Sequence, residues 1–358
     1  MNTISTSDIA HLEQFIKGAQ KIVLTAHMRP DGDAVGSCTA LFHCLKDMGK
    51  DAVIVLPDPS PDYLGFITGT IDKGRLTDFE SDPQGTAEAF SGCDLIFSLD
   101  YNAFHRCGRM EPLLEGSPAK KVLIDHHLNP DRERYDLVFS ETEISSTAEY
   151  LYHILLMTSR YGGSAAKLAG DAAAALMTGM TTDTNNFANS VFPSTLRMAS
   201  SLLETGVDRD SIIGHLYNEY SEGRIRLMGE LLSRKMKITA DGVAYMVLDK
   251  KTMQKYGLKE GDTEGFANLP LGIGKVKMSC FFKEDEDRIR VSLRSKKGVS
   301  ANRCAALYFN GGGHEQAAGG RLSVPGDVKS IDEVAAYTER VTHEFMNSRE
   351  EQMLCAGQ

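Results

Sequence analysis

The sequence predicts an α/β protein with an N-terminal parallel sheet covered by helices on both faces, a helical connector, and a smaller α/β domain at the C-terminus. Three observations lead to this. Strand-like apolar runs alternate with helical patterns in the first half, a purely helical stretch follows, and a hairpin of alternating apolar and charged residues lies near the end. At 358 residues the chain is long for one hydrophobic core and sufficient for two domains.

The first predicted strand is residues 22–26, an apolar run of residues that favour strands. Three side chains with metal-ligand chemistry follow it: His27, Asp31 and Asp33. Apolar residues over 35–48 then recur at helical spacing, and Gly49 stands where a helix cap is expected. A second buried strand, residues 52–56, comes after this helix, which is the order of a parallel sheet.

Two further strands are predicted at residues 95–99 and 121–124. The side chains that follow them are of the same kind: Asp100 after the first, and Asp125, His126 and His127 after the second. In open parallel sheets, ligands bind beyond the carboxyl ends of the strands. We therefore expect the polar residues after these strands to lie together at one edge of the sheet.

A helix contributes one more carboxylate. Residues 176–184 have a helical pattern that we expect to break at Gly179, and Asp183 lies just beyond that glycine. Two histidines and about four carboxylates exceed the needs of one ion. They suit two ions roughly 3.5–4 Å apart that share a carboxylate and a bridging water.

The ligand types also narrow the choice of metal. Carboxylates and imidazoles without thiolates favour Mn²⁺, Mg²⁺ or Fe²⁺ over a structural zinc site, although Zn²⁺ and Co²⁺ also bind such ligands. Mn²⁺ is our first expectation. A pair of such ions produces hydroxide near neutral pH, orients an in-line attack on phosphorus and neutralises the non-bridging oxygens.

The second half begins with residues 194–237, which have helical periodicity and no strand alternation. Strands are predicted at 243–248, 277–282 and 288–295, and the last two form a hairpin. One face of the last strand is polar: Arg288, Arg290, Ser292 and Arg294. The predicted domains are residues 1–193, the connector 194–237, and residues 238–345.

Three successive glycines, Gly311 to Gly313, precede His314 in the C-terminal domain. Backbone N–H groups of such a loop can approach an anion closely. The alternative is a turn ahead of a helix of small residues, and the loop alone does not decide between them. Together with Arg294 and a metal site, the loop and His314 favour a phosphate or nucleotide clamp.

Composition limits the partners. A net charge of −10 argues against tight binding of long nucleic acid, which normally needs a basic stripe, but allows a small or short anionic substrate. No apolar run approaches the ~20 residues of a membrane helix. The seven cysteines form no Cys-x-x-Cys pair, so reduced thiols and a cytoplasmic location are expected.

The ordered motifs resemble those of the DHH phosphoesterase superfamily, in its two-domain form with a DHH-associated C-terminal domain. The resemblance covers residues 5–345, and length and layout look closest to the nanoRNase and 3′-phosphoadenosine 5′-phosphate phosphatase group, often labelled exopolyphosphatase-related. The residues that carry it are His27-x-x-x-Asp31-x-Asp33, Asp100, Asp125-His126-His127 and Asp183 in the first half, and Arg294-Ser295 with Gly311-Gly312-Gly313-His314 in the second.

The resemblance implies a role for each of these residues. One metal would be held by His27, Asp31 and Asp100, and another by Asp33, Asp100, His126 and Asp183. Asp125 would be a ligand or support one, and His127 would contact the scissile phosphate or protonate the leaving group. The substrate's phosphates or terminal nucleotide would be held by Arg294, Ser295, Gly311, Gly312, Gly313 and His314.

The expected function is a metal-dependent phosphoesterase that removes mononucleotides from very short oligonucleotides, or the 3′-phosphate from 3′-phosphoadenosine 5′-phosphate. One alternative is an exopolyphosphatase or a pyrophosphatase; residues 233–237 are similar to a pyrophosphatase signature but precede the C-terminal domain. A non-catalytic nucleotide sensor is another, which a missing ligand would favour, and none is missing. A homodimer through the N-terminal domain or the connector is compatible with this layout.

Overall fold

The computed structural model describes residues 4–218, 220–259, 261–286 and 288–348. The chain forms two compact units, Met1–Glu219 and Tyr220–Gln358. The division between them falls inside the stretch 194–237 that was expected to be a connector. Cys355, one of the seven cysteines, and Asp287, which lies between the two strands of the predicted hairpin, are outside the described residues.

The first unit contains a six-stranded sheet in the order β3-β2-β1-β4-β5-β6, and all its neighbouring strands are parallel. The strands are β1 (Lys21–Thr25), β2 (Asp51–Leu56), β3 (Leu76–Asp78), β4 (Leu95–Leu99), β5 (Lys120–Asp125) and β6 (Leu137–Ser140). The predicted parallel sheet is therefore confirmed. The strand order reverses between β1 and β4, and such a switch point is where open α/β sheets bind ligands.

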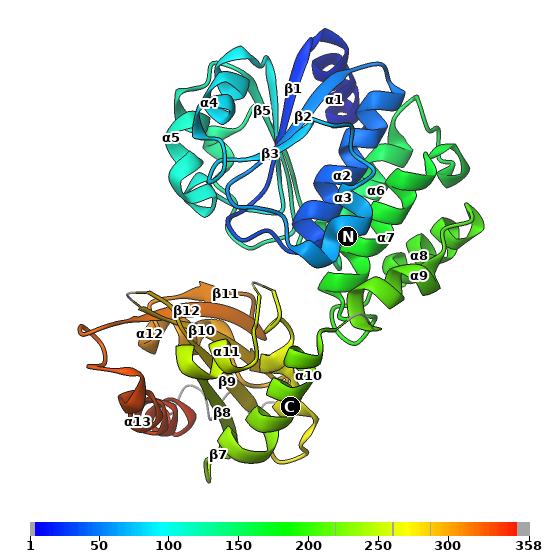
Figure 1. The fold of residues 1–358 in the computed structure, drawn as a ribbon. Helices are drawn as coiled ribbons and strands as arrows, with labels where there is room; N and C mark the ends of the chain where they lie inside the picture. Colours follow the sequence, from blue (N-terminus) through cyan, green and yellow to red (C-terminus); the bar gives the residue numbers. More distant parts are fainter. Residues whose placement is uncertain (1–3, 219, 260, 287, 349–358) are drawn as a thin grey trace. The chain divides into compact units, whose positions relative to one another are not determined.

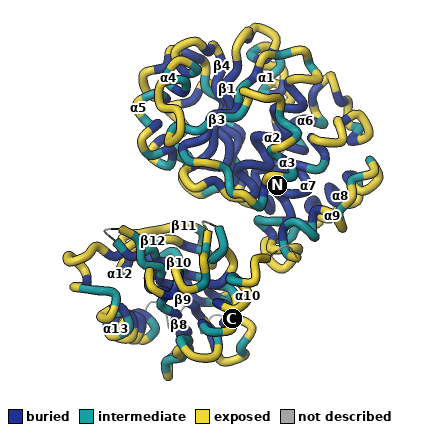
Figure 2. Tube along the Cα trace, in the orientation of Figure 1, coloured by how far each residue is buried: buried dark blue, intermediate teal, exposed yellow. Residues whose placement is uncertain are grey.

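Helices cover both faces of this sheet, as predicted (Figure 1). One face packs against α1 (Thr6–Gly18), α2 (Gly32–Asp47), α6 (Thr147–Met157) and α7 (Gly170–Asp183), and the other against α4 (Pro83–Gly92) and α5 (Glu111–Gly116). Leu24 and Phe97 point to the first face, whereas Val23 and Ile96 point to the second, because side chains alternate along a strand. The central strands are thus buried on both faces (Figure 2).

Helices α2 and α7 pack very closely, and two glycines make this contact. A Cβ atom at Gly36 would lie 2.7 Å from the Ala175 carbonyl oxygen. One at Gly179 would lie 2.9 Å from Asp33 Oδ1 in α2 and 2.7 Å from Ala148 Cβ in α6. Helix α7 runs unbroken from Gly170 to Asp183, so the expected break at Gly179 is wrong. The glycine makes room for neighbouring elements and does not end the helix.

The stretch after α7 is helical, as predicted. The first unit continues with α8 (Pro193–Glu204), α9 (Arg209–Ile213) and a π-helical turn at Gly214–Asn218, and the second unit begins with α10 (Glu222–Glu230) and a π-helical turn at Leu231–Lys235. Shorter helical segments of the first unit are Asp62–Leu64, α3 (Gly65–Thr68), η2 (Phe104–Met110), Arg132–Arg134 and Ala165–Lys167.

The second unit contains a mixed six-stranded sheet in the order β11-β12-β10-β9-β8-β7. Its elements are β7 (Lys237–Ile238), β8 (Val243–Leu248), α11 (Lys250–Lys255), a 3₁₀ helix (Phe266–Gly272), β9 (Met278–Glu284), β10 (Arg288–Ser295), α12 (Ala301–Tyr308), β11 (Gly312–Gly313), β12 (Ala317–Ser323), a 3₁₀ turn (Ile331–Glu333) and α13 (Val334–Met346). The predicted hairpin is the antiparallel pair β9 and β10. In β10, Ile289, Val291 and Leu293 are buried while the arginines between them are half-buried, as the alternation predicted.

Two composition-based expectations can be compared with the described part of the chain. The six cysteines it includes are all free and buried, which agrees with the expected reduced thiols. No helix within it is both long and apolar enough to cross a membrane.

Candidate metal centre

The candidate ligands come together at the carboxyl ends of β1, β4 and β5, next to the C-terminus of α7. His27 and Asp31 follow β1, and Asp33 lies in the first turn of α2. The others follow the same logic: Asp100 comes directly after β4, Asp125 ends β5, His126 and His127 follow it, and Asp183 ends α7. The sheet and the tight contact between α2 and α7 thus bring together residues that are far apart in the sequence.

Asp100 lies at the centre of this cluster. Its Oδ2 atom is 3.4 Å from His27 Nε2, and its Oδ1 atom is 3.4 Å from His126 Nε2. The Thr147 hydroxyl donates a hydrogen bond of 2.9 Å to Oδ1. The backbone of Asp100 is left-handed, with φ of 64°, a conformation that aspartate tolerates better than most residues. One buried carboxylate therefore faces two imidazoles.

The hydrogen bond of His27 identifies the ring nitrogen that could bind a metal. Its Nδ1 atom lies 2.8 Å from the Met28 carbonyl oxygen, which can only accept, so Nδ1 carries the proton. The Nε2 atom then faces Asp100 and Asp31, whose Oδ1 atom is 3.9 Å away, and becomes available to a metal when it loses its proton. A backbone carbonyl that fixes the histidine tautomer in this way is typical of metal ligands.

Asp33 is held by the N-terminus of α6. The Thr147 N–H donates to Oδ2 at 2.7 Å, and the Ala148 N–H donates to Oδ1 at 2.9 Å. Two amides in the first turn of a helix form a favourable site for a carboxylate. Burial nevertheless raises the pKa of Asp33 well above its usual range, and the charges of Asp100 and Asp183 raise it further.

His126 and Asp183 complete the cluster. His126 Nε2 is 3.6 Å from Asp183 Oδ2 and 3.9 Å from Asp33 Oδ2. Burial lowers the pKa of His126, but Asp183, Asp100 and Asp33 outweigh this effect and raise it well above 6.5. Burial also raises the pKa of Asp183, to about 6, against the attraction of His126. The negative charges of these carboxylates thus favour a cation among them, and a proton on His126 compensates only part of that charge.

The pKa values of His27 and Asp100 depend on the same balance between burial and nearby charges. Burial lowers the pKa of His27, yet the hydrogen bond to Asp100 and the charges of Asp31 and Asp100 raise it overall, while Arg106 opposes them. Burial raises the pKa of Asp100, but hydrogen bonds with His126 and His27 hold it well below 3.8. Asp100 therefore remains a charged carboxylate.

This donor set fits divalent cations. The atoms of three overlapping groups lie within 4.8 Å of one another: His27 with Asp31 and Asp100, Asp33 with Asp100 and His126, and Asp100 with Asp125 and His127. Among the described residues, no lysine or arginine forms an ion pair with Asp31, Asp33, Asp100 or Asp183. Of these four, Asp33 and Asp100 are buried, and buried charges are normally paired or bound to a metal.

His127 is oriented by the fully buried Asp125. Its Nδ1 atom lies 2.8 Å from Asp125 Oδ1, and a proton on Nδ1 makes this a charge-assisted hydrogen bond. Asp100 Oδ1 is 3.8 Å from the same nitrogen. A carboxylate that holds one ring nitrogen in this way leaves the other for proton transfer.

The substrate residues expected in the second unit lie at the end of β10 and around β11. The Ser295 hydroxyl donates to the Val299 carbonyl at 2.6 Å. Three amides of the glycine segment donate within the protein: Gly311 to the Ala305 carbonyl, Gly313 to Asn302 Oδ1 and His314 to the Ala317 carbonyl. A Cβ atom at Gly311 would collide with the Gly319 carbonyl oxygen. Close packing of β11 on β12 therefore explains at least one of these glycines without an anion.

The sequence reasoning missed the N-terminus of α6. Thr147 and Ala148 position both Asp33 and Asp100, and Ser146 caps the helix by accepting from the Glu149 N–H at 3.0 Å. The pattern Ser-x-x-Glu at 146–149 is a helix-start signal that could have located this helix end. Nothing in the pattern, however, indicates that the helix end faces Asp33.

Glu149 links this helix end to its surroundings. It is fully buried and accepts hydrogen bonds from the Ser145 N–H at 3.1 Å, the Ser145 hydroxyl, and the Thr195 hydroxyl at 2.7 Å. Burial raises its pKa, but His153, Ser145, Ser194 and Thr195 outweigh burial and lower the pKa to about 2.

We expect Glu149→Gln to destabilise the protein by about 3 kcal/mol at neutral pH, because a pKa lowered from 4.5 to about 2 stabilises the folded state by that order. A lowered pKa contributes stability above pH 4.5, and this contribution is lost as the pH falls toward 2. Urea unfolding of both proteins at pH 7 and pH 3 measures the difference. Glu133→Gln, at an exposed position, serves as the control. An equal destabilisation at both pH values would contradict a role for the Glu149 charge.

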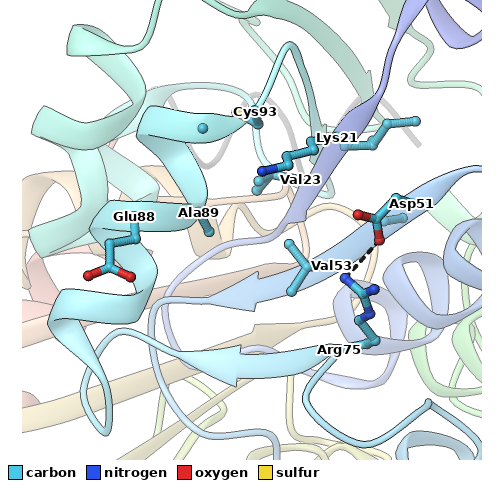
Figure 3. Close-up of a pocket in the computed structure, with 11 residues that line it drawn as sticks. Lys21, Val23, Asp51, Val53, Arg75, Glu88, Ala89 and Cys93 are labelled. Carbon is cyan, nitrogen blue, oxygen red and sulfur yellow. Dashed lines mark ion pairs between the residues drawn. The ribbon is translucent and has the colours of Figure 1, made fainter.

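A separate pocket of about 200 Å³ lies at the other end of the strands (Figure 3). Lys21 and Asp51, the first residues of β1 and β2, line it together with Glu88 and Cys93. Arg75 Nη1 is 2.7 Å from Asp51 Oδ1 there. The candidate ligands follow the last residues of their strands, so this pocket is not the candidate metal centre.

A parallel sheet with a buried carboxylate and imidazole cluster at its switch point defines a metal-dependent hydrolase of phosphoester bonds. Comparison with known proteins gives the family. Residues 21–180 match the DHH family, N-terminal domain, and residues 240–340 match the DHHA1 domain. The chain belongs to the DHH family, in the form that also carries a DHHA1 domain.

Relatives extend over most of the chain. The bifunctional oligoribonuclease and PAP phosphatase NrnA of Thermus thermophilus is 30% identical over 325 residues, which cover 89% of this chain and 87% of that protein. The protein of the same name from Bacillus subtilis is 29% identical over 84% of this chain and 89% of its own length. A crystal structure of an exopolyphosphatase-related protein from Bacteroides fragilis is 34% identical, covers 99% of both chains, and has a TM-score of 0.88.

Proposed function

We propose that this phosphoesterase hydrolyses very short oligoribonucleotides to mononucleotides and removes the 3′-phosphate of 3′-phosphoadenosine 5′-phosphate. The observation that carries the proposal is the likeness, at about 30% identity over more than four fifths of both chains, to relatives named for these two activities. The complete set of candidate ligands supports turnover, because a protein that only senses nucleotides would have no need to keep every one of them.

We infer the following roles for the site residues. His27, Asp31 and Asp100 would hold one divalent ion, and Asp33, Asp100, His126 and Asp183 the other, with Mn²⁺ preferred for ligands that lack thiolate. Two such ions, when bound, supply a hydroxide nucleophile and neutralise the charge on the phosphate oxygens. The N-terminus of α6 keeps Asp33 in place, and Thr147 keeps Asp100 in place.

His127 would protonate the leaving oxygen. Asp125 holds its Nδ1 atom and so fixes the orientation of the ring. In the second unit, Arg294, Ser295, the three glycines and His314 would bind the substrate's phosphates or its terminal nucleotide. For Ser295 this requires its hydroxyl to leave the Val299 carbonyl, or the residue acts only by positioning Arg294.

The layout expected from the sequence belongs to the same proposal. Residues 1–193 would form the catalytic domain, 194–237 the connector and 238–345 the substrate-binding domain. A cytoplasmic location and a homodimer remain predictions.

One panel of substrates tests the proposal. The full chain, loaded with Mn²⁺, is incubated with labelled RNA of roughly two to five nucleotides, 3′-phosphoadenosine 5′-phosphate, polyphosphate and pyrophosphate. We expect turnover of the first two and little of a long RNA, because a net charge of −10 disfavours binding of a long polyanion. An exopolyphosphatase is the second candidate, since the Bacteroides fragilis protein is described as exopolyphosphatase-related. Turnover of polyphosphate or pyrophosphate alone would overturn the proposed substrate, and no turnover of any of the four would favour the sensor.

A further inference from the structure

We propose that Arg106 is a substrate-binding residue, whose guanidinium takes an oxygen of the phosphate that is hydrolysed at the metal centre. No sequence motif pointed to this residue, and the inference deepens the proposed function by adding to the site a cation that recognises phosphate. It rests on the metal ligands proposed above.

Arg106 lies in η2, the 3₁₀ segment that follows Asp100 and its loop. This segment is hydrogen-bonded directly to the end of β1. The Met28 N–H donates to the Arg106 carbonyl at 2.7 Å, and the Cys107 thiol donates to the Ala26 carbonyl at 3.3 Å. The two loops that carry His27 and Asp100 are therefore joined at Arg106, so that its backbone is fixed beside two candidate ligands.

A glycine permits this close approach. Gly108 has φ of 54°, a left-handed conformation that side chains rarely adopt, and a Cβ atom there would collide with the side chain of Met28. The glycine at this left-handed position lets η2 pack against the residues that follow His27. This arrangement keeps the backbone of Arg106 hydrogen-bonded to Met28, the residue after His27.

The guanidinium of Arg106 is not engaged by the part of the chain that the structure describes. Over the residues that the structure describes, it forms no hydrogen bond, ion pair or ring contact, although the residue is only half-exposed. Its charge still acts on His27, whose pKa it tends to lower. An arginine held close to a metal ligand, without a carboxylate of its own, is poised to bind an anion.

The net charge of the metal-loaded centre explains why a nearby arginine would favour phosphate binding. Four carboxylates, those of Asp31, Asp33, Asp100 and Asp183, balance two divalent ions, so the loaded centre is about neutral. A phosphate ester adds negative charge that the metals and their ligands do not cancel. A fixed guanidinium can neutralise it and donate two hydrogen bonds to phosphate oxygens, in the geometry that arginine favours.

Arg109 provides a matched control. It lies three residues farther along the same segment, and its guanidinium stacks over the Phe79 ring at 5.1 Å from the centroid. It therefore has the same charge and lies in the same segment, but its side chain is already engaged with a ring that is no part of the site.

Binding of AMP and of orthophosphate to the Mn²⁺-loaded full chain tests the inference by calorimetry. We expect Arg106→Gln to weaken binding of both by about ten- to a hundredfold, the loss typical of a hydrogen-bonded charge, and Arg106→Lys to recover only part of it. Arg109→Gln should bind both anions as the wild type does. The affinity for Mn²⁺, titrated separately, should stay within about twofold in all three variants.

Four outcomes would overturn the inference: wild-type affinity in Arg106→Gln, an equal loss in Arg109→Gln, a parallel loss of Mn²⁺ affinity in Arg106→Gln, or no binding of either anion by the wild type. Failure of the proposed function has a different signature. A wild type that binds both anions through Arg106 but hydrolyses neither short RNA nor 3′-phosphoadenosine 5′-phosphate would leave Arg106 as an anion-binding residue and overturn the proposed substrates.

Discussion

Replacing Asp100 with asparagine is expected to lower hydrolysis by roughly a thousandfold or more, the largest loss for any single residue of this protein. Among the carboxylates that the structure describes, Asp100 alone lies within 4 Å of more than one imidazole: 3.4 Å from His27 Nε2, 3.4 Å from His126 Nε2 and 3.8 Å from His127 Nδ1. An amide of the same shape keeps the hydrogen bond from Thr147 but removes the charge that two cations would share. The other carboxylates of the cluster face one imidazole each, and neutralising any of them should lower hydrolysis less.

Metal binding provides a second readout of the same variant. Mn²⁺ should raise the melting temperature of the wild type, because a ligand that binds only the folded state stabilises it. We expect most of this increase to disappear in Asp100→Asn. The melting temperature without metal should also fall, because the lowered pKa of Asp100 means that its charge stabilises the metal-free fold. The control for the loss of one negative charge is Asp210→Asn, which replaces an exposed carboxylate on α9. An Asp100→Asn protein that keeps both the Mn²⁺-dependent increase and its activity would exclude a shared role for this carboxylate.

The candidate ligands could be identified from the sequence because each follows a strongly patterned element. His27, Asp100 and Asp125 come at the ends of apolar runs, and the edge of a parallel sheet brings such ends together. The pattern needed no knowledge of side-chain contacts. The same logic located the hairpin of the second unit, where charged and buried residues alternate along β10.

The supporting contacts could not be predicted, since they join residues that no local pattern connects. The bond from the Thr147 N–H to Asp33 spans 114 positions, and the pairing of Met28 with Arg106 depends on the path of a 3₁₀ segment. Gly179 shows the same limit. A glycine within a helical pattern indicates a break when only propensity is considered, whereas the real reason for it is a neighbouring helix that the sequence does not reveal.

The second large effect is expected from Gly36→Ala, which should destabilise the first unit by roughly 3 kcal/mol. Alanine normally stabilises a helix relative to glycine, by about 1 kcal/mol. Here its Cβ atom would lie 2.7 Å from the Ala175 carbonyl oxygen and 3.0 Å from the Gly179 nitrogen. Both atoms belong to the backbone of α7, so they can give way only if α2 and α7 move apart.

Separation of these helices would also disturb the metal centre, because α2 carries Asp33 and α7 ends at Asp183. We therefore expect Gly36→Ala to weaken Mn²⁺ binding as well as to lower the melting temperature. Gly170→Ala, at the start of α7 with nothing within 4 Å of the added methyl, should leave both unchanged or slightly improved. If Gly36→Ala lost stability but bound Mn²⁺ normally, the helix contact would set stability alone. A loss of both would mean that the packing of two helices determines the spacing of ligands they carry, so that the fold and the metal centre depend on one glycine contact.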